Sequence, residues 1–256
     1  MDGPSVTDQK PTVFFHVMKC GGTSVRAGLA TGATGERPGT VTLTESAREL
    51  GNRQIFELDG ETAKVAAGGT NADNWAFRDA LLPYVLLAMQ PSVVLGHFRY
   101  RDRYRDFLDS AHFVTVLRDP VERIVSLYKY RRYHEGIDIP VSTGFDDYIA
   151  NSRWAKEGHA FVDTFVGRDG LDPRSDEAVA AAAANLRRFA VVGFLDRLDD
   201  FSSQVTSRIG KPVTMPMLNA SPAPADSDID DDALERARLV CAPDIQVYEQ
   251  ALAGFA

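Results

Sequence analysis

The chain has few cysteines and no long apolar run. Two cysteines, Cys20 and Cys241, occur among its 256 residues, which argues against a disulfide-built scaffold and favours two free thiols in a reducing compartment. No apolar run reaches the length of about 18 residues that crosses a bilayer, and the first residues lack the basic and apolar regions of a signal peptide. We therefore expect a cytoplasmic protein with no membrane span.

An excess of positive charge is also lacking. Acidic residues outnumber basic ones by 36 to 28, so the formal net charge is -8 at pH 7. A surface of this sign does not attract polyanions, so we expect no nucleic-acid partner and consider a heavily sulfated polymer a poor candidate. A neutral or cationic small molecule is easier to accommodate.

The length of the chain and its apolar fraction of 44% suit one globular domain over residues 1–256, with a disordered tail over residues 1–10. Apolar runs without alternation predict buried parallel strands at residues 13–17, 93–95, 113–117 and 190–194. Helical patterns occupy residues 23–30, 74–88 with an interruption at Pro83, 120–133, 145–151, 176–189, 201–209, 231–240 and 244–253. This alternation predicts a three-layer α/β/α fold with a central parallel sheet, which binds ligands beyond the carboxyl ends of its strands.

The first strand runs into a loop that is suited to hold an anion. Gly21 and Gly22 allow a tight turn and a close approach of the backbone, the N–H groups that follow open a helix, and Lys19 adds a positive charge. A Walker A loop has its lysine after the glycines, next to a hydroxyl that binds magnesium, whereas Lys19 precedes them. The pattern therefore favours a metal-independent transfer of an anionic group.

The third predicted strand also ends in a segment suited to an anion. Asp119 is a suitable helix N-cap, Pro120 suits the first helical position, and Glu122 falls at the third, as in a capping box. Arg118 would then project at the strand end, where its fork can bind a phosphate, and Ser126 lies about two turns into the helix. The alternative is a local ion pair between Arg118 and Asp119 that only fixes the turn.

The two segments carry the patterns F-x-H-x-x-K-x-G-G-T-S, at residues 14–24, and V-x-R-D-P-x-x-R-x-x-S, at residues 116–126. This pair resembles the two cofactor-binding signatures of the sulfotransferases that use 3′-phosphoadenosine-5′-phosphosulfate, especially the carbohydrate branch with the heparan sulfate 2-O- and 6-O-sulfotransferases. Weaker matches at residues 192–201, 218–221 and 244–249 extend the resemblance over nearly the whole chain. The resemblance implies a P-loop-like nucleotide-binding fold, that co-substrate, and 3′,5′-adenosine bisphosphate as product.

The resemblance also implies roles for individual residues. The residues of the first motif that would bind the 5′-phosphosulfate are Lys19, Cys20, Gly21, Gly22, Thr23 and Ser24, and those that would hold the 3′-phosphate are Arg118 and Ser126. Cys20 departs from the family pattern, which usually has a threonine there, and a thiol is a weaker hydrogen-bond donor than a hydroxyl. Beside a lysine and a helix N-terminus, the Cys20 thiol is either reactive through a lowered pKa or an inert loop thiol.

Transfer of a sulfuryl group to an alcohol needs a base for the hydroxyl proton and positive charge at the leaving phosphate. Lys19 is suited to the leaving group. His97 follows a predicted strand, and it resembles the histidine of the glycine-histidine segment that is catalytic in the 2-O-sulfotransferases. Glu57 and Asp59 are alternative bases, because other family members use an acidic one, whereas His16 in the first strand is predicted to be a core residue.

Arginines alternate with other residues directly after His97. The arginines are Arg99, Arg101, Arg103 and Arg105, with Tyr100 and Tyr104 between them. Such arginines can bind an acidic group of an acceptor, and the tyrosines can stack on a ring. The alternative is a solvated surface on which the arginines pair with nearby aspartates.

Taken together, the motifs and the resemblance predict a sulfotransferase that moves a sulfuryl group to a hydroxyl of a saccharide or another small metabolite, with His97 as general base. Two other functions are compatible with the same residues. One is a small-molecule kinase of the P-loop class, with Asp119 as a magnesium ligand. The other is a non-catalytic protein that binds adenosine bisphosphate through Lys19 and Arg118.

Overall fold

A central sheet of five parallel strands organises the protein, in a computed structural model that describes residues 10–32, 39–42, 72–133, 139–140, 142–210, 212–216 and 229–255. The strands are β1 (Thr12–Phe15), β2 (Thr40–Thr42), β3 (Val93–Gly96), β4 (His112–Leu117) and β5 (Val191–Phe194). Four of them confirm predicted strands, and the short β2 was not predicted. The α/β class and the parallel sheet are therefore confirmed, whereas the tail expected over residues 1–10 falls, except for its last residue, outside the described residues.

Helices connect and follow the strands. The α-helices are α1 (Gly22–Gly32), α4 (Ala72–Tyr84), α5 (Pro120–Tyr133), α6 (Phe145–Ala150), α7 (Ser152–Ala155), α8 (Ala160–Phe165), α9 (Asp176–Leu186), α10 (Leu198–Ile209), α11 (Asp231–Val240) and α12 (Ala242–Phe255). Short 3₁₀ segments are η3 (Asp102–Phe107), η4 (Lys156–His159) and η5 (Leu195–Arg197), and η2 (Val85–Met89) is a π-helical turn. The π-turn begins two residues after Pro83, where a proline disturbs the helical hydrogen bonds, as the sequence predicted.

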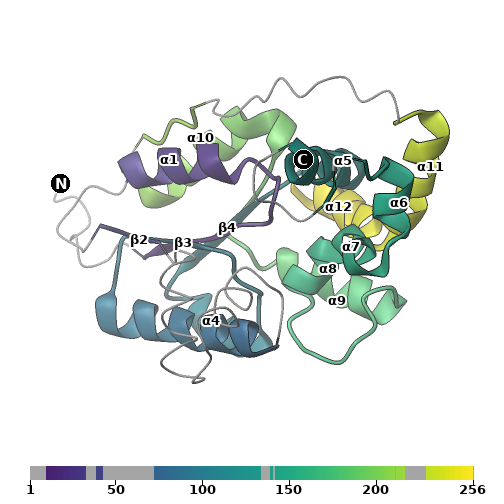
Figure 1. The fold of residues 1–256 in the computed structure, drawn as a ribbon. Coiled ribbons are helices and arrows are strands. Elements are labelled where there is room, and N and C mark those ends of the chain that lie inside the picture. The colour runs from purple at the N-terminus through teal and green to yellow at the C-terminus, as the bar shows by residue number, and fades with distance from the viewer. Residues whose placement is uncertain are drawn as a thin grey trace, which may run out of the picture.

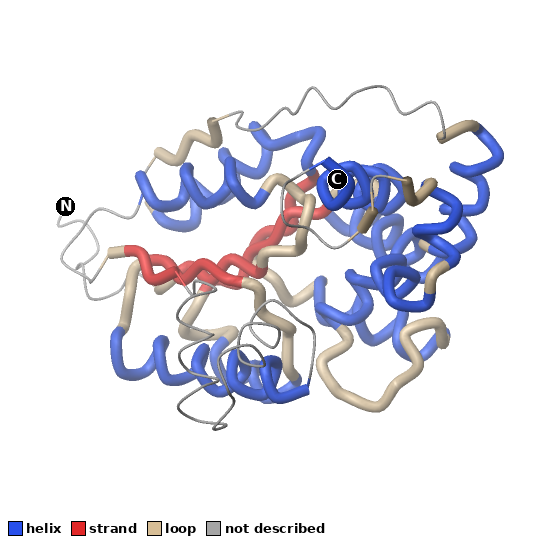
Figure 2. Tube along the Cα trace, viewed as in Figure 1, coloured by secondary structure: helices blue, strands red, loops and turns tan. Residues whose placement is uncertain are grey.

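The two faces of the sheet bury separate apolar cores, and Figure 1 shows helices on both sides of the strands. Phe14, Val114 and Val116 point to one face, where α1 and α10 cover them. Phe15 and Phe113 point to the opposite face, which α4, α8, α9 and α12 cover. This alternation of strand side chains gives three layers, helices, sheet and helices, and Figure 2 shows the strands lying between them.

The order of the strands creates a point where two connections diverge. The strand order is β2-β3-β1-β4-β5, so the chain leaves β1 toward the β2 edge and leaves β4 toward the β5 edge. The carboxyl ends of β1 and β4 are neighbours in this sheet. Ligands of open parallel sheets bind at such a point, outside the carboxyl ends of the strands.

No helix within the described parts of the chain is long and apolar enough to cross a membrane.

The two cysteines are both free and buried, which confirms the prediction of two free thiols.

A buried ion pair and its hydrogen bonds join four helical segments, α5, α8, α12 and η4. Arg123 of α5 and Asp244 of α12 are both fully buried, and Nη2 of Arg123 lies 3.9 Å from Oδ2 of Asp244. The Asp244 carboxylate also accepts hydrogen bonds from the backbone N–H groups of Phe161 and Val162, at 2.9 and 3.1 Å. Arg123 donates to the carbonyl of Glu157 in η4. One carboxylate therefore caps α8 and balances the charge of a buried arginine.

Replacing this carboxylate should be costly. We expect Asp244→Asn to lower the free energy of unfolding by about 3–5 kcal/mol, because Arg123 would keep a buried charge without its counter-charge. Asp146→Asn is the matched control, since Asp146 pairs with Arg236 at 2.6 Å on the surface, where such a pair contributes up to about 1 kcal/mol. Urea unfolding measures both, and equal small losses would contradict a stabilising role of the buried pair.

Candidate functional site

A strained turn connects β1 to α1. Lys19 adopts a positive φ of 66° and Gly21 one of 74°, a left-handed conformation that is unusual for a lysine. The N–H of Cys20 donates to the carbonyl of Val17 at 3.3 Å, and α1 begins at Gly22. The predicted junction of strand, tight turn and helix is confirmed, and strain at a non-glycine residue is a common property of functional loops.

The paired glycines are required by packing. A Cβ atom on Gly22 would lie 1.8 Å from Nε2 of His16, and one on Gly21 would lie 2.5 Å from Cδ1 of Leu195. Neither position has room for a larger residue unless its neighbour moves. The sequence suggested that these glycines allow an anion to approach, and the structure adds that Gly22 lets the turn fold against the His16 ring.

His16 and His97 form a stacked pair at the ends of β1 and β3. Their ring centroids are 4.2 Å apart with an angle of 28° between the planes. The N–H of His16 donates to the carbonyl of Gly96 at 2.9 Å, and Nδ1 of His97 lies 2.8 Å from the carbonyl oxygen of His16. A carbonyl oxygen only accepts, so Nδ1 carries the proton and a neutral His97 keeps Nε2 as its proton-accepting nitrogen.

His16 is the residue of the site whose role the sequence missed. It was predicted to be a core residue within the first strand, but it follows β1 and lies between the rings of Phe14 and His97. Burial lowers the pKa of His16 well below its ordinary value of 6.5, and the nearby His97 adds to this effect. Phe15 of β1 is in register with Gly96 of β3, so the residues that follow them, His16 and His97, lie together. This register could not be predicted from either segment alone.

Arg118 lies at the carboxyl end of β4, as predicted. Its Nε pairs with Oε2 of Glu122 at 3.2 Å, while Oδ1 of Asp119 accepts from the N–H groups of Val121 and Glu122 at 3.0 and 2.9 Å. Asp119 is therefore the N-cap of α5, and the alternative of an Arg118–Asp119 pair is replaced by an Arg118–Glu122 pair. Glu122 thus binds Arg118 in addition to occupying the third helical position.

Lys19 and Arg118 lie close enough to influence each other. Burial lowers the pKa of Lys19, and the positive charge of Arg118 lowers it further. Nζ of Lys19 lies 4.4 Å from the centroid of the Tyr130 ring, which belongs to α5. Ser126 precedes Tyr130 by four residues and thus shares its helix face, half-buried. The structure therefore brings both predicted motifs, with Lys19, Arg118 and Ser126, together at the carboxyl ends of β1 and β4.

The remaining predicted donor residues occupy the start of α1. Thr23 is exposed there, Ser24 is buried, and both follow Gly22 in the first turn of the helix. Cys20 is fully buried, and its Sγ lies 3.8 Å from the carbonyl of Met18. Burial raises the pKa of the Cys20 thiol to about 12, so the reactive alternative for this thiol is wrong and the inert one holds.

The arginine-rich segment after His97 divides into buried and exposed residues. Tyr100 and Tyr104 belong to the core, so the expectation that they stack on an acceptor ring is wrong. Arg103 and Arg105 are exposed. Pairing with aspartates is confirmed where Arg101 binds Asp79 and Asp169 and where Arg105 binds Asp102. The alternative bases Glu57 and Asp59 lie outside the described residues.

The contact between Gly22 and His16 can be tested by a double-mutant cycle. We expect Gly22→Ala to lower the free energy of unfolding by about 1–3 kcal/mol, because the new methyl group collides with the imidazole. In a His16→Ala background the same change should cost less, with a coupling energy of about 0.5–3 kcal/mol. Gly254→Ala is the control, since a Cβ there meets nothing within 4 Å. Additive effects of the two changes would contradict the contact.

The lowered pKa of His16 should make stability depend on pH. The unfolded chain takes up a proton at His16 as the pH falls below about 6.5, whereas the folded protein does not, because burial lowers the pKa there. The free energy of unfolding should therefore fall by up to about 1.4 kcal/mol per pH unit below this value. We expect a shallower fall in His16→Asn, measured by urea unfolding between pH 7.5 and 5. Parallel curves for the two proteins would contradict a His16 that stays neutral in the folded protein.

Comparison of the chain with protein-family models and with characterised protein sequences finds no match. Its function has therefore to be inferred from the site itself, in which the turn at Lys19, the guanidinium of Arg118 and the stacked His97 lie at the carboxyl ends of three adjacent strands.

Proposed function

We propose that the protein is a sulfotransferase that moves the sulfuryl group of 3′-phosphoadenosine-5′-phosphosulfate to an acceptor hydroxyl. The observation that carries this proposal is that Lys19 and Arg118 lie close together at the carboxyl ends of β1 and β4, where the two chain connections diverge. His97 lies at the carboxyl end of β3, the strand on the other side of β1. The sheet would then be of the P-loop-like nucleotide-binding type. The enzyme would be cytoplasmic, with a small metabolite or saccharide as acceptor and no nucleic-acid partner.

The N-termini of α1 and α5, which follow β1 and β4, are suited to different tasks. α5 is already capped by the carboxylate of Asp119 and has Glu122 in its first turn. α1 has no acidic residue in its first turn, and it begins at Gly22, three residues after Lys19. The N-terminus of α1 therefore suits the phosphosulfate, since backbone N–H groups and the helix dipole favour an anion there. Arg118, at the start of α5, suits the separate 3′-phosphate.

The histidine pair suits the removal of a proton from the acceptor. In the proposed step the acceptor oxygen attacks sulfur in line, the bond from sulfur to the bridging phosphate oxygen breaks, and the leaving phosphate keeps the electron pair. The hydroxyl proton moves to Nε2 of His97, the nitrogen left as acceptor because Nδ1 faces the carbonyl of His16. The positive charge of Lys19 favours the negative charge that develops on the leaving phosphate.

The kinase alternative is less compatible with the geometry. It needs a carboxylate such as Asp119 to hold magnesium, but Oδ1 of Asp119 accepts two backbone N–H groups as the N-cap of α5. The lysine-first order of the loop also differs from that of a nucleoside-triphosphate site. The non-catalytic alternative shares the donor site and differs only in turnover.

Binding of 3′,5′-adenosine bisphosphate tests the donor site. We expect calorimetry without metal to show binding that Lys19→Ala and Arg118→Ala each weaken at least about tenfold, because each change removes a charged partner of a phosphate. Arg236→Ala removes a surface arginine that pairs with Asp146 and should leave the affinity unchanged. Binding of ATP with magnesium in place of the bisphosphate would overturn the proposal in favour of a kinase.

Turnover separates the enzyme from the non-catalytic alternative. With labelled donor and a panel of hydroxyl acceptors, His97→Asn should lose about 10²–10⁴-fold in turnover while it still binds the bisphosphate. A wild-type protein that binds the bisphosphate but transfers nothing to any acceptor would support the non-catalytic alternative.

A further inference from the structure

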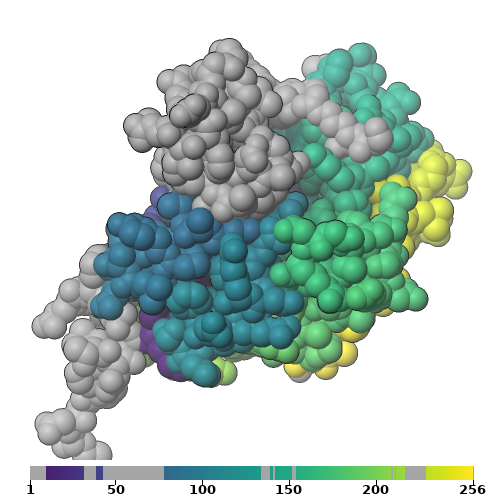
Figure 3. Space-filling model, turned by 90° about the horizontal axis from the view of Figure 1, so that it is seen from below, coloured from purple at the N-terminus to yellow at the C-terminus, as the bar shows by residue number. Residues whose placement is uncertain are grey.

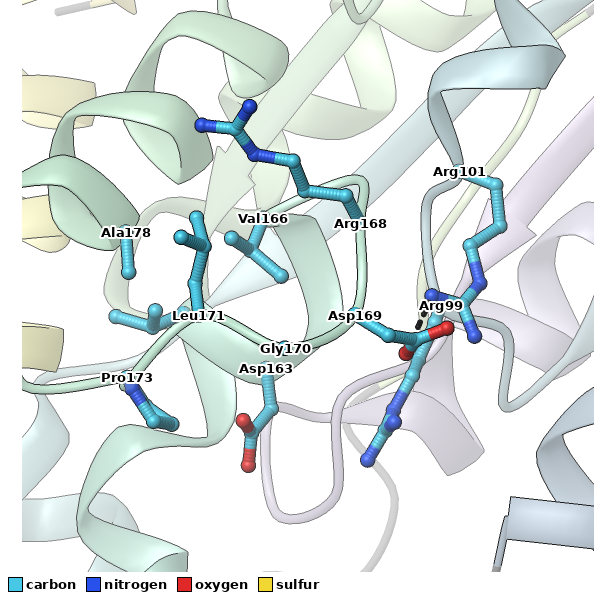
Figure 4. A pocket seen from close by; sticks show the side chains of 11 residues that line it. Arg99, Arg101, Asp163, Val166, Arg168, Asp169, Gly170, Leu171, Pro173 and Ala178 are labelled. Atoms are coloured by element: carbon cyan, nitrogen blue, oxygen red, sulfur yellow. Dashed lines mark hydrogen bonds and ion pairs between the residues drawn. The ribbon is translucent and has the colours of Figure 1, made fainter.

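A small cavity is lined by residues that follow β3, beginning with Arg99, two residues after the candidate base. It has a volume of about 110 Å³ and lies between the segment that follows His97 and the end of α8 with its following loop (Figure 4). The N–H of Tyr100 donates to the carbonyl of Thr164 at 2.7 Å, and Arg101 forms a bridge with Gly167. Figure 3 shows the blue surface that carries this segment against the green surface of α8 and α9. Backbone hydrogen bonds therefore fix the walls of the cavity.

Burial alternates along the segment from His97 to Arg101, as in extended chain, and Arg101 itself has extended backbone angles of φ -126° and ψ 141°. Phe98 and Tyr100 are buried, whereas His97, Arg99 and Arg101 are half-buried. This alternation places the three half-buried residues on one face, and extended chain rises about 3.3 Å per residue. Arg99 and Arg101 thus follow the candidate base by roughly 7 and 13 Å along the same face.

Apolar and charged side chains both line the cavity. Val162, Val166 and Leu171 are among the apolar ones, and the charged ones are Arg99, Arg101, Arg168, Asp163 and Asp169. Figure 4 shows Arg99 and Asp163 pointing toward the same side, and Arg168 pointing away from them. Such a lining suits a small ligand with one charged end and a short apolar stem.

The charged side chains that line the cavity have different surroundings. Arg101 is held by Asp79 at 2.5 Å and by Asp169 at 2.8 Å, and the carboxylate of Asp163 lies 3.0 Å from Nδ1 of His159. For Arg99, burial outweighs the attraction of Asp163, Asp169 and Asp79, and its pKa is lowered. A bound anion at Arg99 would offset this cost of burial.

We propose that this cavity binds a carboxylate of the acceptor, with Arg99 as the opposite charge, while the acceptor hydroxyl lies at His97. The proposal rests on the proposed sulfotransferase function and gives it a substrate class, a small hydroxy acid whose two groups are separated by roughly 7 Å, the spacing of His97 and Arg99 along extended chain. A volume of about 110 Å³ suits a small acid rather than a polymer. An acceptor with one carboxylate is also compatible with a chain of net charge -8, which disfavours a polyanion.

Binding of simple probes tests the cavity without the donor. We expect calorimetry to show that phenylacetate binds at least about tenfold more tightly than the isosteric phenylacetamide, and that phenethylamine does not compete. Arg99→Met should abolish this preference, and Arg99→Lys should keep part of it. Arg103→Met is the control, since Arg103 is 62% exposed and does not line the cavity. Equal binding of acid and amide by the wild-type protein, or equal effects of the changes at Arg99 and Arg103, would overturn the proposal.

Transfer assays connect the cavity to the reaction. With the sulfuryl donor, the wild-type protein should prefer 4-hydroxyphenylacetate to 4-hydroxyphenylacetamide at least about tenfold in kcat/KM, and Arg99→Met should remove the preference through KM. Transfer to both phenols at equal rates would refute the carboxylate site and leave the sulfotransferase function intact. Phenylacetate binding that needs Arg99, together with no binding of adenosine bisphosphate, would refute the sulfotransferase function and leave a carboxylate site.

Discussion

The pairing of β1 with β3 on one side and β4 on the other is the constraint on which the candidate site depends. Phe15 is in register with Gly96 and with Thr115, and the buried hydroxyl of Thr115 donates to the carbonyl of Phe15 at 2.8 Å. The chain therefore leaves β1 and β3 at the same level, which stacks the residues that follow, His16 and His97. β4 continues for two residues beyond this level, so Arg118 emerges farther out, beside the turn that carries Lys19. A slip of one residue in either pairing would turn these side chains to the other face of the sheet.

Much of this framework follows from local sequence. The apolar runs without alternation predicted four of the strands, because parallel strands covered on both faces need apolar residues at every position. The bounds of α5 were predicted to the residue, since Asp119 and Pro120 mark its start through the chemistry of the N-cap. β2 escaped prediction because Thr40–Thr42 is a short, half-buried edge strand without an apolar run. Its place in the sheet is set by its pairing with β3.

The features that sequence could not reveal depend on contacts between distant segments. Arg123 received no role from the sequence beyond its place in the second motif, and it is fully buried beside Asp244, which lies 121 positions later and supplies the opposite charge. Tyr104 reads as part of an exposed basic and aromatic run, yet its hydroxyl donates to the carbonyl of Asp79 at 3.1 Å and its ring lies in the core. Both side chains have a polar group at the end of a large apolar part, so the sequence alone does not predict that they are buried.

The candidate donor site gathers positive charge at a cost to the folded protein. Burial and Arg118 together lower the pKa of Lys19, which means that the folded state disfavours the charged lysine relative to the unfolded chain. The turn adds backbone strain, because Lys19 holds a left-handed conformation that a glycine would adopt more easily. The chain has a net charge of -8, so acidic residues that could neutralise these cations are more numerous than basic ones. An anion bound between Lys19 and Arg118 would reverse the electrostatic part of this cost, so ligand binding and folding stability would rise together. A loop that only connected β1 to α1 would gain nothing from this arrangement.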